Sequence, residues 1–200
     1  MNSWILTGGV AAGKTAVWRI LENLGIAGFR PFSCDDAAAE ALQTLGVIDQ
    51  LSQSFGPEIV DVEVIDRSWI RTNVLPVPEK RARLEAIVHP VVFAKLEAAR
   101  VAAEREGSNL FVAEVPLHYE TGESVSADLI IVVAASRSMQ VRRMMENRGL
   151  DEHSVHSFLN AQWPIEAKAE RADVVIWNDG DISALEAQVL NLTSHLRQSK

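Results

Sequence analysis

The chain alternates short apolar runs with longer segments in which apolar residues recur every three or four positions. Short apolar runs bounded by turn residues are typical of buried strands, whereas the longer periodic segments are typical of amphipathic helices. Regular alternation of the two predicts an α/β fold in which helices cover both faces of a mostly parallel sheet. The expected strands are Trp4–Leu6, Gly28–Phe32, Leu110–Val115, Leu129–Ala134 and Val174–Trp177.

Two helices at opposite ends of the chain have clear apolar stripes. The first has apolar residues at i, i+3, i+4 and i+7, from Val17 to Leu24, and Gly25 is its expected C-terminal cap. The last has capping-box spacing from Ser183 to Glu186. Its expected buried stripe consists of Leu185, Val189, Leu192 and Leu196.

The segment from about residue 37 to residue 106 lacks a clear core strand and is rich in helix signals. We interpret it as a helical insertion that covers a second substrate. From Glu79 to Glu106, acidic, basic and alanine residues alternate, which predicts a solvated pair of helices interrupted at His89-Pro90.

Residues 6–17, LTGGVAAGKTAV, match the pattern G-x-x-x-x-G-K-[ST] between an expected strand and an expected helix. Small residues let backbone N–H groups surround a phosphate, the lysine reaches the β- and γ-phosphates, and the Thr15 hydroxyl binds Mg²⁺. The helix N-terminus adds the positive end of its dipole. The pattern therefore predicts a nucleoside triphosphate site, formed by Gly9, Val10, Ala11, Ala12, Gly13, Lys14, Thr15 and Ala16.

The charge balance narrows the classes of partner. The chain has 19 basic and 27 acidic residues, and its formal net charge of −8 argues against a general nucleic-acid or anionic-membrane surface. The single cysteine, Cys34, excludes an internal disulfide and fits a reducing compartment. No apolar run approaches the length of a membrane-spanning helix. We therefore expect a cytoplasmic protein, either a monomer or a small homo-oligomer.

Two aspartates, Asp35 and Asp36, follow the second expected strand. A carboxylate at the end of the strand beside the phosphate loop can accept a proton from an attacking hydroxyl and help to hold Mg²⁺. Equally, these aspartates could be N-caps of the alanine-rich helix that follows. The residues alone leave both interpretations open.

Four arginines lie close together after the fourth expected strand, within SRSMQVRRMMENRG. In an acidic chain such a cluster is informative, because the guanidinium groups repel one another unless anions separate them. Phosphoryl transfer needs groups of this kind to neutralise charge on the transferring oxygens. The alternative is an exposed helix whose basic side chains simply face the solvent. The four are Arg137, Arg142, Arg143 and Arg148.

Along nearly its whole length, the chain resembles the dephospho-coenzyme A kinases. The phosphate loop alone is unspecific, but the His-Pro, Val-Pro-Leu and Ala-Asp…Asn motifs in this order and spacing are far more specific. The matching segments are TGGVAAGKT, the Asp35 segment, FGPEIV at Phe55–Val60, IDRSWIR at Ile65–Arg71, LEAIVHP at Leu84–Pro90, EVPLHYE at Glu114–Glu120, the arginine segment, AQWPIEAK at Ala161–Lys168 and ADVVIWNDG at Ala172–Gly180.

The resemblance implies transfer of the ATP γ-phosphoryl group to the 3′-hydroxyl of dephospho-CoA, with Mg²⁺ as cofactor, in the last step of CoA synthesis. It implies a P-loop NTPase fold of three α/β/α layers around a five-stranded parallel sheet. The whole chain, residues 1–200, would be a single P-loop kinase domain. Its helical substrate-domain insertion would span about 37–106, and its arginine-bearing lid about 137–165.

Individual residues match the family's motifs. Asp35 falls on the catalytic aspartate, which would act with Lys14, and Arg143 falls on the first lid arginine. Asn178 lies in the loop near the adenine of ATP. Arg67, His89, Pro116 and Leu117 fall in substrate-side motifs. Three of these segments also have a purely structural interpretation. His89-Pro90 is a good helix start, Pro116-Leu117 is a possible strand end, and Asn178–Gly180 is a possible turn.

The chain departs from the family pattern mainly at substrate-side positions. Family members commonly carry Asp-x-Asp where this chain has Ser33-Cys34-Asp35, an arginine at the position of Ala39, and Leu-Leu where it has Leu117-His118. These departures leave open a kinase for another small acceptor on the same scaffold, or a nucleotide-binding regulatory protein that has lost transfer.

The lid also departs from the family pattern, because Asn147 stands at the position of the second lid arginine, with Arg148 beside it. Gly149 is an expected helix stop. A frayed final turn before it would let Arg148 swing back toward the phosphates.

Overall fold

The computed structural model describes residues 1–121 and 125–197. Contacts between Cα atoms divide the chain into two compact units. The core unit consists of Met1–Phe32 together with the chain from Ala102 onward, and the helical unit is Ser33–Val101.

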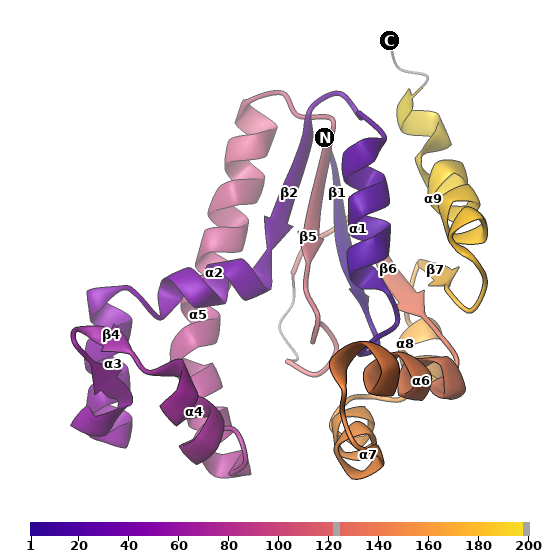
Figure 1. Ribbon diagram of the computed structural model, residues 1–200. Coiled ribbons are helices and arrows are strands. Elements are labelled where there is room, and N and C mark those ends of the chain that lie inside the picture. The colour runs from indigo at the N-terminus through magenta and orange to yellow at the C-terminus, as the bar shows by residue number, and fades with distance from the viewer. Residues whose placement is uncertain (122–124, 198–200) are drawn as a thin grey trace. The chain divides into compact units, whose positions relative to one another are not determined.

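The core unit contains a five-stranded parallel sheet (Figure 1). Its strands are β1 (Asn2–Gly8), β2 (Phe29–Ser33), β5 (Leu110–Glu114), β6 (Leu129–Ala134) and β7 (Val174–Trp177), in the order β2-β5-β1-β6-β7. β1 pairs with both β5 and β6, so that Leu6 lies opposite Glu114 on one side and Ile131 on the other. The five expected strands and their parallel arrangement are confirmed. In such a sheet, ligands bind at the carboxyl ends of the strands, at the point where the strand order reverses.

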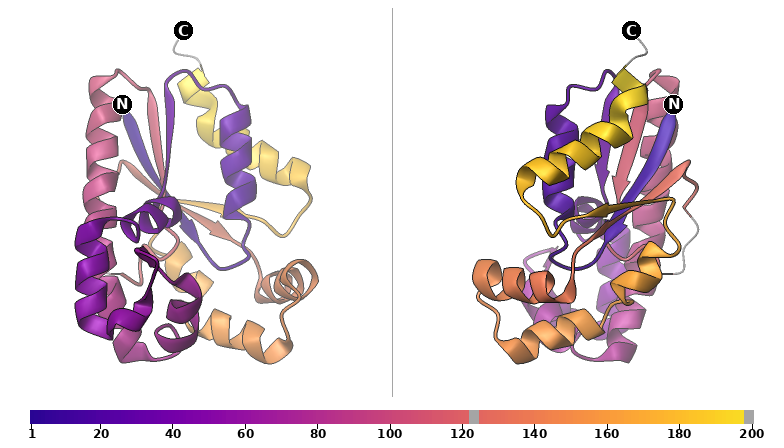
Figure 2. Two further views of the ribbon diagram at one scale, coloured as in Figure 1. Left: turned by 60° about the vertical axis from the view of Figure 1, so that its left-hand side comes forward. Right: turned by 90° about the vertical axis from the view of Figure 1, so that its right-hand side faces the viewer.

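Helices cover both faces of this sheet. On one face, α1 (Lys14–Asn23) and α9 (Ile182–Arg197) contact each other and pack against alternate residues of the strands (Figure 2). Trp4 and Leu6 of β1 belong to this core. The intervening positions point to the other face, where Val132 and Ala134 of β6 pack with Ile165 of α8 (Ile165–Ala169). Burial on both faces explains why the strands are almost continuously apolar.

The ends of α1 and α9 only partly follow the expectations. Gly25, with φ of +59°, follows α1 as expected, and Leu185 and Val189 of α9 are fully buried. The expected capping box at Ser183 is wrong, because Asp181 accepts the N–H of Ala184 at 2.9 Å. A carboxylate one position before the helix therefore satisfies its first turn instead.

The arginine segment forms α6 (Arg137–Arg148), which packs against α7 (Glu152–Asn160). Both helices begin with side-chain caps: Ser136 accepts the N–H of Met139, and Asp151 accepts the N–H of Ser154.

The helical unit begins with α2 (Cys34–Ala41) and α3 (Leu45–Phe55), followed by the short 3₁₀ helix η1 (Pro57–Ile59). A hairpin of β3 (Val60–Asp61) and β4 (Val64–Ile65) leads into α4 (Arg67–Asn73). Both residues of its two-residue turn, Val62 and Glu63, have positive φ angles, of 44° and 67°.

The expected helix pair at 79–106 is wrong, because α5 (Pro78–Arg105) is one continuous helix that contains Pro90. Proline removes one backbone hydrogen bond and usually breaks or kinks a helix. Here Val88, Val92 and Leu96, spaced four residues apart, are all buried on one side of the helix. This buried apolar stripe continues on both sides of the proline, and its burial favours one continuous helix over a break at Pro90.

Across the described part of the chain, no helix combines the length and the hydropathy needed to span a membrane.

Candidate active site

The phosphate loop joins β1 to α1, and two of its glycines are required by the backbone. Gly8 has φ of +145°, and a Cβ there would collide with the carbonyl oxygen of Val133 in β6. Gly13, with φ of +104°, is the N-cap of α1, and a Cβ there would collide with the side-chain amide of Asn178. The loop is therefore pressed against β6 and the end of β7 at positions where no larger residue fits.

Side-chain amides hold the start of the loop from outside. Gln140 of α6, which is almost completely buried, donates to the carbonyl oxygen of Val10 at 2.7 Å. The carbonyl of Gln162 accepts the Val10 N–H at 2.9 Å. In a trans peptide the C=O and the following N–H point in opposite directions. Because the Val10 carbonyl is bound by Gln140, the N–H of Ala11 points to the opposite side of the loop.

Arg143 and Asn178 hold the next two carbonyls in the same way. The Asn178 side-chain amide donates to the carbonyl of Ala12 at 2.8 Å. Arg143 Nη1 lies 3.3 Å from the carbonyl oxygen of Ala11 and 3.2 Å from that of Ala12. The N–H of Gly13 then points away from these partners. The N–H groups of Ala11 and Gly13 are thus turned away from the side chains that bind the neighbouring carbonyls, which is the arrangement an anion needs. The N–H of Ala12 instead donates to the carbonyl oxygen of Gly9 at 3.3 Å.

The Lys14 side chain folds back over the phosphate loop. Its Nζ donates to the carbonyl oxygens of Gly9, at 3.1 Å, and Gly8, at 3.4 Å. The lysine charge therefore lies beside the first half of the loop, while the N-terminus of α1 begins at its second half. Both contribute positive potential.

A pocket of about 460 Å³ opens beside α1 and takes in several of the expected nucleotide-binding residues. Thr15, Ala16 and Asn178 are among them, and Arg143 forms part of the same wall. Among the described residues that line the pocket are three arginines and no acidic residue. The full lining consists of Ala11, Gly13, Thr15, Ala16, Arg19, Arg143, Asn147, Arg148, Asn178, Gly180, Ile182 and Leu185.

The end of α6 differs from the expected frayed turn. Gly149 has φ of +62°, its N–H donates to Met145, and the next N–H, from Leu150, donates to Met144. These bonds close the final turn in an ordinary glycine cap. The predicted fraying is therefore wrong, yet Asn147 and Arg148 both line the pocket beside α1 from the intact helix.

The two remaining arginines of the cluster have other partners. Arg142 forms an exposed ion pair with Glu146, at 2.9 Å. Arg137 donates to the side-chain carbonyl of Asn160 at 3.2 Å and approaches His156 Nδ1. The structure therefore divides the cluster, with two arginines at the pocket beside α1 and two in surface contacts of α6 and α7.

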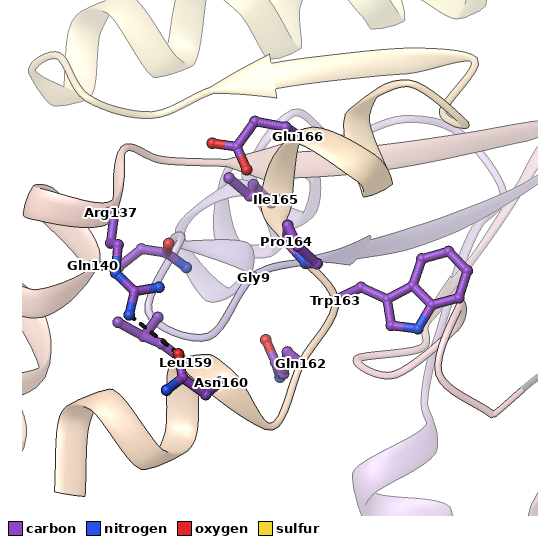
Figure 3. Close-up of a pocket in the computed structure, with 10 residues that line it drawn as sticks. All are labelled: Gly9, Arg137, Gln140, Leu159, Asn160, Gln162, Trp163, Pro164, Ile165 and Glu166. Atoms are coloured by element: carbon purple, nitrogen blue, oxygen red, sulfur yellow. Dashed lines mark hydrogen bonds between the residues drawn. The ribbon is translucent and has the colours of Figure 1, made fainter. Parts of the chain in front are cut away.

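A second cavity, of about 400 Å³, opens at Gly9, between α6, the end of α7 and the segment Gln162–Glu166 (Figure 3). Gln140 and Arg137 line it from α6. The Gln162 side chain, which bonds to the loop, comes from the segment between α7 and α8.

A buried ion pair connects that segment with the turn after β5. Lys168 of α8 is completely buried, and its Nζ lies 2.6 Å from Glu120 Oε1, which also accepts the N–H of Trp163 at 3.0 Å. The expected substrate residues Pro116 and Leu117 lie, half-buried, in the same turn.

His118 is also buried in this turn, and its ring lies edge-on to that of Tyr119 at 5.0 Å. Burial lowers the pKa of His118 below its ordinary value, although the charge of Glu120 acts in the opposite direction. The imidazole is therefore held in its neutral form more strongly than a solvated histidine.

In the helical unit, Asp35 lies on the first turn of α2 with its side chain exposed. The N-cap of this helix is Ser33, whose hydroxyl accepts the N–H of Asp36 at 3.1 Å. The interpretation of Asp35 and Asp36 as N-caps is therefore wrong, because the serine that departs from the family pattern performs this role. Neither carboxylate is used to start the helix.

The helical unit has its own pocket, of about 300 Å³, between α2, α4 and α5. Arg67 and His89, two of the expected substrate residues, both line it. Arg67 also donates to the carbonyl of Ala39 at 3.0 Å, and the His89 ring packs edge-on against Phe93. Most of the other lining residues are apolar: Ala38, Leu42, Ile70, Leu75, Leu84 and Val88.

Sequence reasoning missed Gln140, Gln162 and Arg19. The two glutamines lie inside segments that resemble the family, but no local pattern marks a side chain that bonds to a loop at the other end of the chain. Arg19 could have been found from its spacing, because i and i+4 share a helix face and Thr15 was already assigned to the nucleotide.

Comparisons with known proteins agree with this architecture. A sequence profile of the dephospho-CoA kinase family matches residues 4–184. A dephospho-CoA kinase from Geobacillus kaustophilus is 36% identical over 188 residues, which is 92% of each chain.

Two solved structures have similar folds. A protein from Thermus thermophilus is 30% identical, with a TM-score of 0.80 over 100% of this chain and 98% of its own. A dephospho-CoA kinase from Campylobacter jejuni is 24% identical, with a TM-score of 0.64 over 98% and 97% of the two chains, and supports the fold alone. With the profile match and the Geobacillus relative, it follows that this chain belongs to the dephospho-CoA kinase family.

Proposed function

We propose that this protein transfers the γ-phosphoryl group of ATP to the 3′-hydroxyl of dephospho-CoA and so forms coenzyme A. The family supports the reaction class. The observation that carries the proposal is the phosphate loop, whose carbonyls are bound from behind by Gln140, Arg143 and Asn178. The amides of Ala11 and Gly13 are thereby preorganised for a polyphosphate, and such preorganised donors are a main source of catalysis in phosphoryl transfer.

Residues of the core unit would bind and orient ATP. The loop from Gly9 to Gly13, through its Ala11 and Gly13 amides, and the Lys14 ammonium would bind the β- and γ-phosphates, and Asn178 would lie near the adenine. The Thr15 hydroxyl is an exposed oxygen ligand in the same pocket, and this donor suits Mg²⁺. Bound there with the phosphate oxygens, Mg²⁺ would neutralise part of their charge.

Asp35 would be the general base. As the 3′-oxygen forms its bond to the γ-phosphorus, the bond between that phosphorus and the β,γ-bridging oxygen breaks and ADP leaves. Asp35 would accept the proton of the hydroxyl. Its exposure and the capping of α2 by Ser33 support this role, because the carboxylate is not engaged in holding the helix.

The helical unit would bind the acceptor. Its pocket combines an apolar wall with Arg67 and His89, which suits a ligand with an uncharged arm and phosphate groups. Pro116 and Leu117 of the core unit would contribute to the same substrate. In these terms the insertion at about 37–106 is the substrate domain, and the segment at about 137–165, with Arg143, is the lid.

Arg143 would stabilise the transferring phosphoryl group, and it also contacts the phosphate loop. Its guanidinium is bound to the carbonyls of Ala11, Ala12 and Asn178, the last at 2.8 Å. It therefore supports the loop as well as the pocket wall.

We further propose that the enzyme acts in the cytoplasm as a monomer or small homo-oligomer, without a nucleic-acid or membrane partner; its acidic charge and single cysteine support this.

The test is ADP release by the purified full chain with ATP and Mg²⁺, with dephospho-CoA, nucleosides and nucleoside monophosphates offered separately as acceptors. We expect turnover on dephospho-CoA and mass-spectrometric detection of coenzyme A as the product. Faster turnover on a nucleoside or its monophosphate would identify a kinase for another acceptor. ATP binding without turnover on any of them would identify a nucleotide-binding protein that has lost transfer.

A further inference from the structure

Arg19 lies in the nucleotide pocket, although no sequence motif marks it. It is an exposed residue of α1, one helical turn after Thr15, and both residues line the same pocket. Asn147 and Arg148 line this pocket from α6. Two helices that are distant in sequence thus each present an arginine to one cavity.

Helix geometry directs the Arg19 side chain toward the phosphates. Residues at i and i+4 lie on the same helix face, and each Cα–Cβ bond tilts toward the helix N-terminus. The rise between Thr15 and Arg19 is about 6 Å, which an extended arginine side chain can span. The guanidinium can therefore lie over the first turn of α1, where the unsatisfied amides face the anion.

The pocket also defines which end of the triphosphate Arg19 would meet. Lys14 Nζ lies at the Gly8 and Gly9 end of the loop. The apolar residues Ile182 and Leu185 line the pocket that holds Arg19, and such residues suit a nucleotide base. A triphosphate bound between these ends has its γ-phosphate near Lys14 and its α-phosphate near Arg19.

The charge distribution supports an anionic ligand at Arg19. Several surface arginines of this chain form ion pairs with glutamates, as Arg30 does with Glu106 and Arg142 with Glu146. Within residues 1–121 and 125–197, Arg19 has no carboxylate within ion-pair distance. In the part of the chain that the structure describes, its pocket is lined by two other arginines and by no acidic side chain, although the net charge of the chain is −8. Such charges repel one another unless an anion lies between them.

We propose that Arg19 is a nucleotide-binding residue that contacts the α-phosphate of ATP from α1, whereas Arg148 lines the same pocket from α6. This inference rests on the proposed use of ATP. The α-phosphate stays with the leaving ADP, so the contact is the same before and during transfer. Arg19 therefore strengthens binding of the nucleotide without accelerating the transfer step.

The experiment is calorimetric titration of the full-length protein with Mg·ATP and with Mg·ADP, for wild type, Arg19→Gln and Arg19→Lys. Arg142→Gln is the matched control, because Arg142 is an exposed helical arginine outside the pocket. We expect Arg19→Gln to weaken both nucleotides by a similar factor, about five- to tenfold. Arg19→Lys should lose less, since it keeps the charge, and the control should stay within about twofold.

Several results would overturn the assignment. These are an unchanged dissociation constant in Arg19→Gln, an equal loss in the control, or weakening of ATP with no weakening of ADP. The titration needs no acceptor, so it does not depend on the proposed reaction. A wild-type protein that binds ATP but does not phosphorylate dephospho-CoA would contradict the proposed function. The titration would still decide whether Arg19 binds the nucleotide. Where transfer is measurable, Arg19→Gln should raise KM for ATP and leave kcat nearly unchanged. A fall in kcat with KM unchanged would also overturn the proposal.

Discussion

The phosphate loop of the core unit and the candidate acceptor residues of the helical unit are built in opposite ways. Four side chains from distant parts of the chain hold the backbone of the loop: Gln140, Arg143, Gln162 and Asn178. In the helical unit, by contrast, Asp35 is exposed on the first turn of a helix, and Arg67 and His89 line an open pocket.

The proposed function accounts for this difference by what each part would bind. A triphosphate is recognised by backbone amides, which cannot rotate independently, so the protein must fix the whole loop in advance. An acceptor with a flexible arm can be bound by side chains on helix surfaces. The structure therefore predicts that changes in the loop supports alter ATP binding, whereas changes at Asp35 alter turnover alone.

The largest expected effect is at the proposed base. Asp35→Asn should lower kcat by about 10²–10⁴-fold, because an amide cannot accept the proton of the acceptor hydroxyl. Steady-state kinetics with dephospho-CoA would measure this. Asp36→Asn is the matched control, since both residues lie exposed on the first turn of α2. A greater loss in the control would show that the base has been assigned to the wrong residue.

A comparable effect in free energy, on stability rather than rate, is expected at the buried ion pair of the core unit. Lys168→Met should lower the free energy of unfolding by about 3–5 kcal/mol, because it leaves the Glu120 carboxylate largely buried without its cation. Urea denaturation would measure the loss. The double variant Lys168→Met/Glu120→Leu should recover most of it. If it is no more stable than the single variant, the cost does not come from an uncompensated charge.

Sequence patterns predicted the core unit better than its contacts. The strands and the loop were predictable because a strand, a glycine-rich turn and a helix are local and periodic. Gln140 was not, since its partner Val10 lies 130 residues away. At Pro90 a local rule predicted a helix break, and at the start of α2 the residues left aspartate caps and a catalytic carboxylate equally open. Instead, a continuous apolar stripe through Val92 is buried along one unbroken helix, and the Ser33 hydroxyl caps α2.

A smaller effect is expected from the pH dependence of stability. The pKa of His118 is lowered below 6.5 by burial, so the unfolded chain binds this proton more readily than the folded one. Stability should therefore fall as pH drops below about 6.5. His118→Leu, the residue usual in the family, should reduce this fall. Thermal unfolding at pH 7.5 and pH 5 would measure it, and an unchanged pH dependence would show that His118 does not contribute.

The smallest effect is expected in the helical unit, at the turn between β3 and β4. Val62 and Glu63 both have positive φ, which side chains other than asparagine and glycine disfavour. Replacing the pair with Asn-Gly should raise the free energy of unfolding by about 1 kcal/mol. Urea denaturation would measure this gain. A loss of stability would mean that this turn conformation is not strained.

The most direct test of the contrast between the two units is the dissociation constant of Mg·ATP, measured by calorimetry for Gln140→Leu and Asp35→Asn. Gln140→Leu should weaken ATP binding by about tenfold, because the Val10 carbonyl loses its partner and the loop loses its fixed geometry. Asp35→Asn should bind ATP within about twofold of wild type, despite its loss of turnover. If Gln140→Leu bound ATP normally, the loop would not depend on this side-chain support, and if Asp35→Asn lost as much affinity, Asp35 would serve ATP binding as well as turnover. Either result would contradict the contrast between the two units.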